Sequence, residues 1–241
     1  MTFWLCDFMT NTSDAVFRLS PRIEVLPILH ASGDLAQEVR ETLIGRRFDC
    51  LAIPLPPSVE QAVERSVEDL PRISLVSLPE PAGDEGPVVS FVPIDPCQAV
   101  IMGIRVAMGE GIARAYIDRD VTVFEPTPFA APDPYVLKTV PLASFASALL
   151  PSLPTPPPQS QQQDRIAWMA FRLHELELDY ESILCLCHLA DWPWLREAYQ
   201  ERRPYAEPEP LAGRPSIYPV AASTLYFVLG ELPFLTELYE R

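Results

Sequence analysis

Along the first half of the chain, short apolar runs alternate with segments whose apolar residues recur at helical spacing. Apolar runs of strand length are found at residues 23–29, 48–55, 73–78, 88–94 and 113–117. Helical stripes separate several of them, at residues 34–44, 59–67 and 97–108. Strands that alternate with helices at this spacing indicate a parallel sheet. We therefore predict an α/β fold with a largely parallel or mixed sheet, built from βαβ units with helices on both faces.

The second half continues this pattern after a compositional break. Residues 151–163 are rich in proline and glutamine, which predicts an extended linker. A helix at 164–180, a strand at 183–188 and a helix at 192–203 follow, and then a proline-rich connection at 204–219. Residues 220–241 are apolar and predicted helical, with a break at Pro233. The helical pattern of this segment stops partway through a turn, so we expect that the sequence continues in a longer protein.

Proline is the residue that complicates the strand assignments. The chain has 28 prolines against nine glycines, which implies stiff connections and many element boundaries at proline. Pro27 lies inside the first apolar run, where it cannot donate a ladder hydrogen bond. We expect the strand either to bend there or to be unpaired on that side.

Composition narrows the classes of function. The chain has 241 residues, of which 48% are hydrophobic, and this is enough to form one large core. Its net charge of −15 disfavours nucleic acid and anionic membranes as partners. No apolar run reaches the ~20 residues that cross a bilayer, and the N-terminal sequence lacks the basic start of a signal peptide. Most of the five cysteines lie in apolar contexts. Buried, reduced thiols are the expectation, which favours the cytoplasm.

Two of the three histidines end apolar runs. His30 follows residues 23–29 and precedes a helix with Ser32 and Asp34 as capping residues, and His188 closes the run at 183–188. Because ligand sites in open α/β sheets lie beyond the carboxyl ends of the strands, we predict one shared site for His30 and His188. A histidine there can bind a metal, act as a base or orient a substrate. The alternative is a histidine hydrogen-bonded at a sheet edge. His174, on the long helix, is predicted to lie on a solvated face.

A charged triplet ends another predicted strand. Asp118 and Asp120 flank Arg119, and the two carboxylates share a side if the strand continues through them. Together His30, His188 and Asp120 supply ligands suited to zinc or manganese. The alternative is an ion-pair cluster at the start of a loop. The sequence contains no Gly-rich phosphate loop, no G-x-S-x-G elbow and no H-E-x-x-H motif.

Several stretches in order resemble the TraB/PrgY family, within the group that includes TIKI proteins, erythromycin esterases and ChaN-like proteins. In the first part of the chain, Leu26–His30 is similar to the family's opening strand, which ends in histidine, Glu38–Arg40 to its E-V-R helix and Phe48–Leu55 to its V-E-L strand. Further along, Ile117–Asp120 is similar to a strand end that reads I-D-R-D, Asp164–Ala170 to an R-D-x-x-M-A helix and Cys185–His188 to a strand end that reads G-A-G-H. The resemblance implies one domain at residues 22–203, with residues 1–21 as a lead-in, residues 151–163 as a surface linker and residues 204–241 as an appended connection and helices. It also implies a site of His30, Asp118, Arg119, Arg165 and His188, with Asp120 as a further candidate.

The chain departs from the family pattern at positions that matter for catalysis. Pro54 stands where the family has the glutamate of V-E-L, which could serve as a metal ligand or general base, and bulkier residues replace the glycines before both histidines. Two functions remain open. One is a metal-dependent hydrolase of the peptidase or esterase type that acts on a small molecule or peptide. The other is a catalytically inactive TraB-like binding or regulatory domain.

Overall fold

A four-stranded parallel sheet forms the centre of the molecule. The computed structural model describes residues 17–82, 88–231, 235–236 and 238. In this sheet, here called sheet A, the strand order is β1-β6-β2-β5, and every pair is parallel. Its strands are β1 (Ile23–Ile28), β6 (Ile183–His188), β2 (Cys50–Ile53) and β5 (Ala113–Tyr116). The strands β1, β2 and β6 are almost wholly buried, as expected for strands covered on both faces, whereas the edge strand β5 is mostly half-buried.

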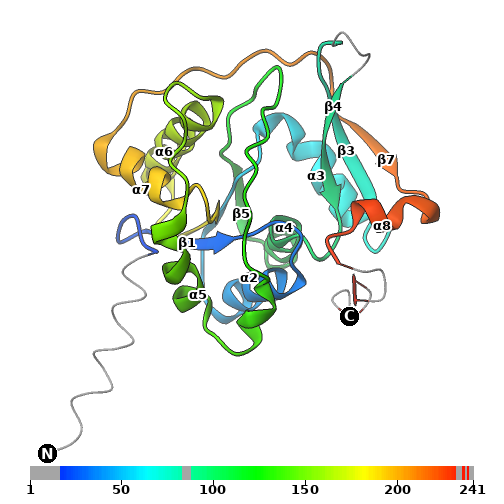
Figure 1. Ribbon diagram of the computed structural model, residues 1–241, viewed down its shortest axis with the longest axis horizontal. Coiled ribbons are helices and arrows are strands. Elements are labelled where there is room, and N and C mark those ends of the chain that lie inside the picture. Colours follow the sequence, from blue (N-terminus) through cyan, green and yellow to red (C-terminus); the bar gives the residue numbers. More distant parts are fainter. Residues whose placement is uncertain (1–16, 83–87, 232–234, 237, 239–241) are drawn as a thin grey trace, which may run out of the picture.

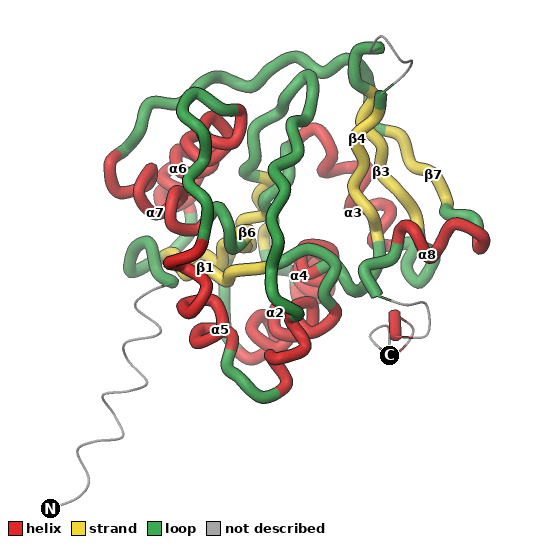
Figure 2. The backbone as a smooth tube through the Cα atoms, viewed as in Figure 1, coloured by secondary structure: helices red, strands yellow, loops and turns green. Residues whose placement is uncertain are grey.

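Two layers of helices cover sheet A (Figures 1 and 2). On one side α2 packs on α4, and on the other α6 packs on α7. Their bounds are α2 (Gly33–Gly45), α4 (Ala99–Glu110), α6 (Gln161–Asp179) and α7 (Trp192–Glu201). The approach of α4 is close because it carries Gly103, where a Cβ would lie 3.0 Å from Leu186 of β6 and 3.2 Å from Val39 of α2. The α/β class with helices on both faces is therefore confirmed.

Three strands form a separate antiparallel sheet, here called sheet B. Its order is β4-β3-β7, with β3 (Ser74–Pro79), β4 (Val89–Ile94) and β7 (Ser216–Pro219), and α3 (Glu60–Glu68) packs beside it. The expectation that residues 73–78 and 88–94 extend a parallel series of strands is wrong. Residues 80–88 between them are too few for a parallel crossover, which takes about a dozen residues or more.

The proline-rich connection at residues 204–219 also contains more structure than predicted, because β7 lies within it. In the helical segment expected after it, α8 spans Leu225–Val228, and the described residues 235, 236 and 238 are helical as well. Pro233 and part of the last segment lie outside the described residues. The remaining elements are α5 (Leu142–Leu149) and single turns of 3-10 helix at Pro57–Val59, Pro134–Lys138, Leu150–Ser152 and Ala222–Thr224.

Capping residues set where the helices begin. Ser32 accepts a hydrogen bond from the N–H of Leu35 and starts α2, and Ser160 accepts one from Gln163 and starts α6. The second cap places Gln161–Gln163, predicted as linker, in the first turn of α6. The segments on either side of residues 151–160 build the same sheet, because β6 lies between β1 and β2.

Pro27 is accommodated because β1 is an edge strand. The backbone N–H groups of odd-numbered residues in β1 point away from β6, as the hydrogen bond from the N–H of Val25 to the carbonyl of Phe17 shows. Pro27 has the same parity as Val25, so its missing N–H faces the open side of the strand. Phe17 itself is buried and its ring lies 5.6 Å from that of Trp192. The part of the predicted lead-in that the structure describes is thus attached to the core.

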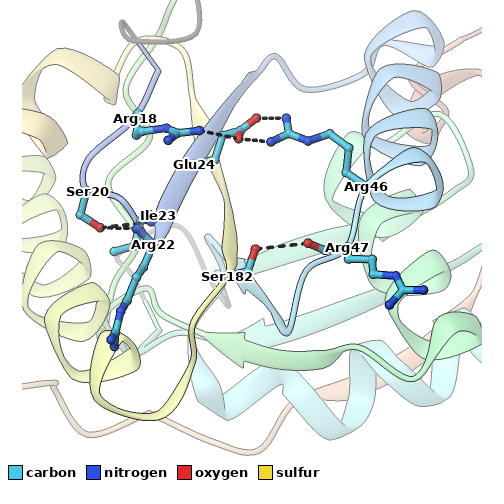
Figure 3. Close-up of polar contacts among 8 residues, drawn as sticks. All are labelled: Arg18, Ser20, Arg22, Ile23, Glu24, Arg46, Arg47 and Ser182. Carbon is cyan, nitrogen blue, oxygen red and sulfur yellow. Dashed lines mark hydrogen bonds and ion pairs between the residues drawn. The ribbon is translucent and has the colours of Figure 1, made fainter.

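Polar contacts fix the amino end of β1 (Figure 3). Glu24 lies between Arg18 and Arg46 and accepts hydrogen bonds from the Arg46 guanidinium. The hydroxyl of Ser20 accepts from the N–H groups of Arg22 and Ile23, at 3.1 Å each. Because the arginine side chains at this end are largely exposed, their ion pairs add little stability, and their main effect is to fix the position of the strand.

Leu51 of β2 tests whether the centre of sheet A is the main source of stability. It is fully buried, next to the close contact at Gly103. We expect Leu51→Ala to lower the free energy of unfolding by about 2–5 kcal/mol, since it opens a cavity in a rigid core. The measurement is urea unfolding followed by circular dichroism. Leu178→Ala, at a site that is 83% exposed on α6, is the control and should change the value by less than about 0.5 kcal/mol. Equal losses in both variants would contradict the prediction.

Candidate functional site

The two strand-end histidines lie against each other at the carboxyl edge of sheet A. The parallel register pairs Ile28 of β1 with His188 of β6, and His30 follows two residues later. The imidazole rings of His30 and His188 are stacked, with centroids 5.1 Å apart and an angle of 19° between planes. The ring of Phe129 meets His188 edge-on at 5.6 Å. Residues separated by about two thirds of the chain therefore form one polar cluster at this edge.

The hydrogen bond that His188 accepts defines its tautomer. The backbone N–H of Ala190 donates to Nδ1 of His188 over 3.3 Å. Because that nitrogen accepts a proton donor, the neutral ring carries its own proton on Nε2. Nε2–H of His188 is thus a hydrogen-bond donor. Through this nitrogen, a neutral His188 can polarise a ligand oxygen.

Both histidines are neutral at pH 7. Burial, assisted by the positive charge of Arg165, lowers the pKa of His188 from 6.5 to about 4. For His30, loss of hydration is the main cause that lowers its pKa to about 4, and His188 contributes, while Asp191 opposes the shift. His30 nevertheless keeps an exposed surface, so solvent moderates its shift more than that of the half-buried His188.

Asp191 is a carboxylate of the cluster that the sequence reasoning missed. It immediately precedes α7, three residues after His188, and its Oδ1 accepts a hydrogen bond of 2.6 Å from Nε2 of Gln162. Burial raises its pKa, and Gln162 and Arg165 oppose that shift. The sequence signal for Asp191 was its position at the start of a predicted helix, shortly after the strand-end His188. Carboxylates are favoured at the N-terminus of a helix.

Asp118 and Arg165 form a buried ion pair beside the histidines. Asp118 follows β5 and Arg165 lies in the first turns of α6. Nε of Arg165 donates to both oxygens of Asp118, at 3.0 and 3.2 Å, and a terminal nitrogen adds a further contact. The Asp118 side chain is 4% exposed and that of Arg165 is 18% exposed. The charge of the Arg165 guanidinium is therefore balanced by Asp118.

Arg119 and Asp120 are engaged elsewhere. The Arg119 guanidinium donates to the carbonyl of Glu207 and pairs with the Glu209 carboxylate at 3.2 Å, which fastens the proline-rich connection to the loop after β5. Asp120 lies near Asp118 and Ser58; burial and the Asp118 charge raise its pKa, and Ser58 opposes that shift. The contacts described for both residues thus lead away from the histidine pair.

His174 is not on a solvated face, because its ring stacks on Tyr199 with centroids 4.0 Å apart.

Pro54 occupies the same edge. It directly follows β2, the strand between β6 and β5, so it lies on the sheet between His188 and Asp118. The position at which the resemblance implies a glutamate is therefore central to the cluster. A proline there supplies neither a metal ligand nor a base.

A metal ion fits this arrangement poorly. Among the residues that the structure describes, no group of three or more His, Cys, Asp or Glu side chains could hold a metal. The contact with Ala190 assigns the proton of His188 to Nε2, and moving that proton to Nδ1 would oppose the N–H of Ala190. The zinc or manganese site that combines His30, His188 and Asp120 stays a prediction. Within the described part of the chain, no helix is both long and apolar enough to cross a membrane.

Comparison with known proteins gives no further guide. The sequence matches no protein-family model, and neither the curated proteins nor the solved structures gave a significant match. The arguments about function therefore rest on the residues of this chain and on their geometry.

His188 predicts how stability depends on pH. Its pKa is depressed in the folded protein, so between about 6.5 and about 4 the unfolded chain binds a proton that the folded ring excludes. Lowering the pH through this window should cost on the order of 3 kcal/mol of unfolding free energy through this residue. The His188→Gln variant should show a correspondingly weaker loss in urea unfolding across the window. Parallel pH profiles for wild type and variant would contradict the prediction.

The Asp118–Arg165 pair predicts a strong dependence of each partner on the other. Arg165→Met leaves a buried carboxylate without its cation and should cost about 3–5 kcal/mol of unfolding free energy, whereas the double variant with Asp118→Leu should recover part of the loss. Arg22→Met, which breaks an exposed pair with Glu181, is the matched control and should cost less than about 1 kcal/mol. Additive losses in the double variant would show that the two side chains do not interact.

Proposed function

We propose that the carboxyl edge of sheet A is a binding site for a small molecule or peptide with an amide or ester carbonyl. The observation that carries this proposal is the stacked, neutral histidine pair with the proton of His188 on Nε2. A neutral imidazole held in this way by a backbone N–H donates a hydrogen bond to a carbonyl oxygen. It does so without adding a positive charge.

The charge balance of the cluster favours a neutral ligand. Arg165 and Asp118 cancel each other, both histidines are uncharged, and Asp191 supplies the remaining negative charge when ionised. An anionic ligand would meet that carboxylate without a free cation among the described residues of the cluster. A neutral carbonyl group matches a donor such as Nε2–H and avoids this repulsion.

Binding without turnover is the better supported of the two functions left open by the sequence. A general base works best with a pKa near the operating pH, and a pKa of about 4 makes either histidine a weak base at pH 7. Pro54 removes the carboxylate that could assist. We therefore propose a TraB-like binding or regulatory domain that has the polar strand-end cluster implied by the resemblance and lacks a complete hydrolytic site.

Hydrolysis is the second candidate, and one observation favours it. Asp191 lies near enough to His30 to raise its pKa against the effect of burial. A carboxylate next to an imidazole strengthens the imidazole as a base. If solvent moderates the shift of the exposed His30 further, its pKa approaches the range in which a base is effective. The substrate would be an ester or amide of the same class.

The test uses N-acetyl-alanine methylamide as a neutral carbonyl probe, acetate as an anionic probe and zinc chloride as a metal probe. Imidazole nitrogen NMR at pH 7 should show shifts of the His188 Nε2 signal and of the signals of the stacked His30 ring with the amide, and little response to acetate. In His188→Phe the His30 signals should no longer respond to the amide. His174→Phe, in the stacked pair with Tyr199, is the matched control.

Three outcomes would contradict the binding proposal. One is a zinc response of both ring signals with no amide response, which would support the metal site. Another is turnover of p-nitrophenyl acetate that is lost in His30→Ala, which would support the hydrolase. No response to any of the three probes would also reject it.

A further inference from the structure

The turn that presents His30 has an unusual backbone. Ala31, the next residue, has φ of 59°, in the left-handed region. That conformation costs a residue with a Cβ roughly 1–2 kcal/mol. Strained backbone persists where surrounding groups hold it in place. The contacts around Ala31 therefore indicate what keeps His30 over His188.

A glutamine from the start of α4 holds this turn. Oε1 of Gln98 accepts a hydrogen bond of 3.0 Å from the N–H of Ala31. Its Nε2 donates to Oδ2 of Asp95 at 3.1 Å, and that second bond fixes which end of the amide faces the turn. Asp95 is fully buried and accepts a further bond of 2.8 Å from the N–H of Cys97. The Gln98 side chain is thus locked at both ends.

The C-terminal segment also lies against this turn. The backbone N–H of Gly230 donates to Asp95, and a Cβ at Gly230 would lie 2.6 Å from Cα of Ala31. Such a distance leaves no space for any side chain at position 230. Next to it, Glu231 accepts a hydrogen bond of 3.4 Å from the N–H of Gly33 at the start of α2. The turn is therefore held between the Asp95–Gln98 pair and residues 230–231.

We propose that Gln98 is a positioning residue for His30, and that Gly230 completes the clamp that keeps the His30 ring stacked on His188. The proposal deepens the proposed binding site and rests on it for its biological meaning. The contacts described for both residues are with the backbone of the turn and with Asp95. Both act through the backbone of Ala31, so their loss changes the environment of His30 more than that of His188, which loses only its stacked neighbour and keeps Arg165 beside it.

The first experiment is an NMR pH titration of the histidines in the full chain without ligand, so its result is independent of whether the carbonyl site exists. In Gln98→Leu, the pKa of His30 should rise from about 4 toward 6.5, by about 1 unit or more, as the turn relaxes into solvent. The pKa of His188 should rise less than that of His30, because its ring loses only the cover of His30 and stays beside Arg165. Gln61→Leu, at an exposed position on α3, is the matched control and should change neither.

Gly230→Ala displaces the same turn by direct contact with Ala31 and tests the proposal if Gln98→Leu does not fold. It should raise the pKa of His30 in the same selective way, whereas Gly109→Ala, with open space around its added Cβ, should not. An unchanged His30 pKa in a folded variant would overturn the proposal. Equal shifts of His30 and His188 would also overturn it, because they would indicate general loosening of the sheet edge.

Discussion

The insertion of β6 between β1 and β2 is the constraint on which the rest of the structure depends. It joins two segments that lie far apart in the sequence and forces both to end at the same edge. His30 and His188 meet because neighbouring parallel strands place their carboxyl ends side by side. The same pairing brings α6 and its Arg165 over the end of β5. Without β6 at the centre, the carboxyl edge would have neither the histidine pair nor the Asp118–Arg165 ion pair.

Removal of polar groups from water gives this edge its chemistry. At the amino end of sheet A the arginines around Glu24 are exposed, so their charges interact weakly with one another (Figure 3). At the carboxyl end the Asp118–Arg165 pair is buried, and burial is the main cause that lowers the pKa values of both histidines and raises that of Asp191. Acidic and basic side chains occur at both ends, and the two ends differ in the hydration of these charges. That contrast is the physical reason for placing the site at the carboxyl edge.

Strand positions and the site edge followed from sequence because apolar periodicity and strand-end polar residues are local signals. Sheet B was misassigned because antiparallel pairing of residues 73–78 with 88–94 depends on the short segment between them, and the pairing with β7 joins residues from distant parts of the chain. Asp191 was missed because helix-capping aspartates are common, and only its proximity to His30 distinguishes it. Arg119 and Asp120 could not be separated from Asp118 by sequence, since their partners Glu207, Glu209 and Ser58 come from remote segments.

Pro54 and Gln98 affect the carboxyl edge in different ways. Proline at the end of β2 supplies no carboxylate and does not disturb the strand, because Cys50–Ala52 pair with both β6 and β5 and Ile53 pairs with β5. Gln98 and Asp95, by contrast, are a buried polar pair whose donors and acceptors face one another, and they hold a strained turn at Ala31. Strain that the surroundings maintain at one residue fits a ring whose orientation matters. Together these features favour a fixed recognition site over a site that has merely lost its catalytic residues.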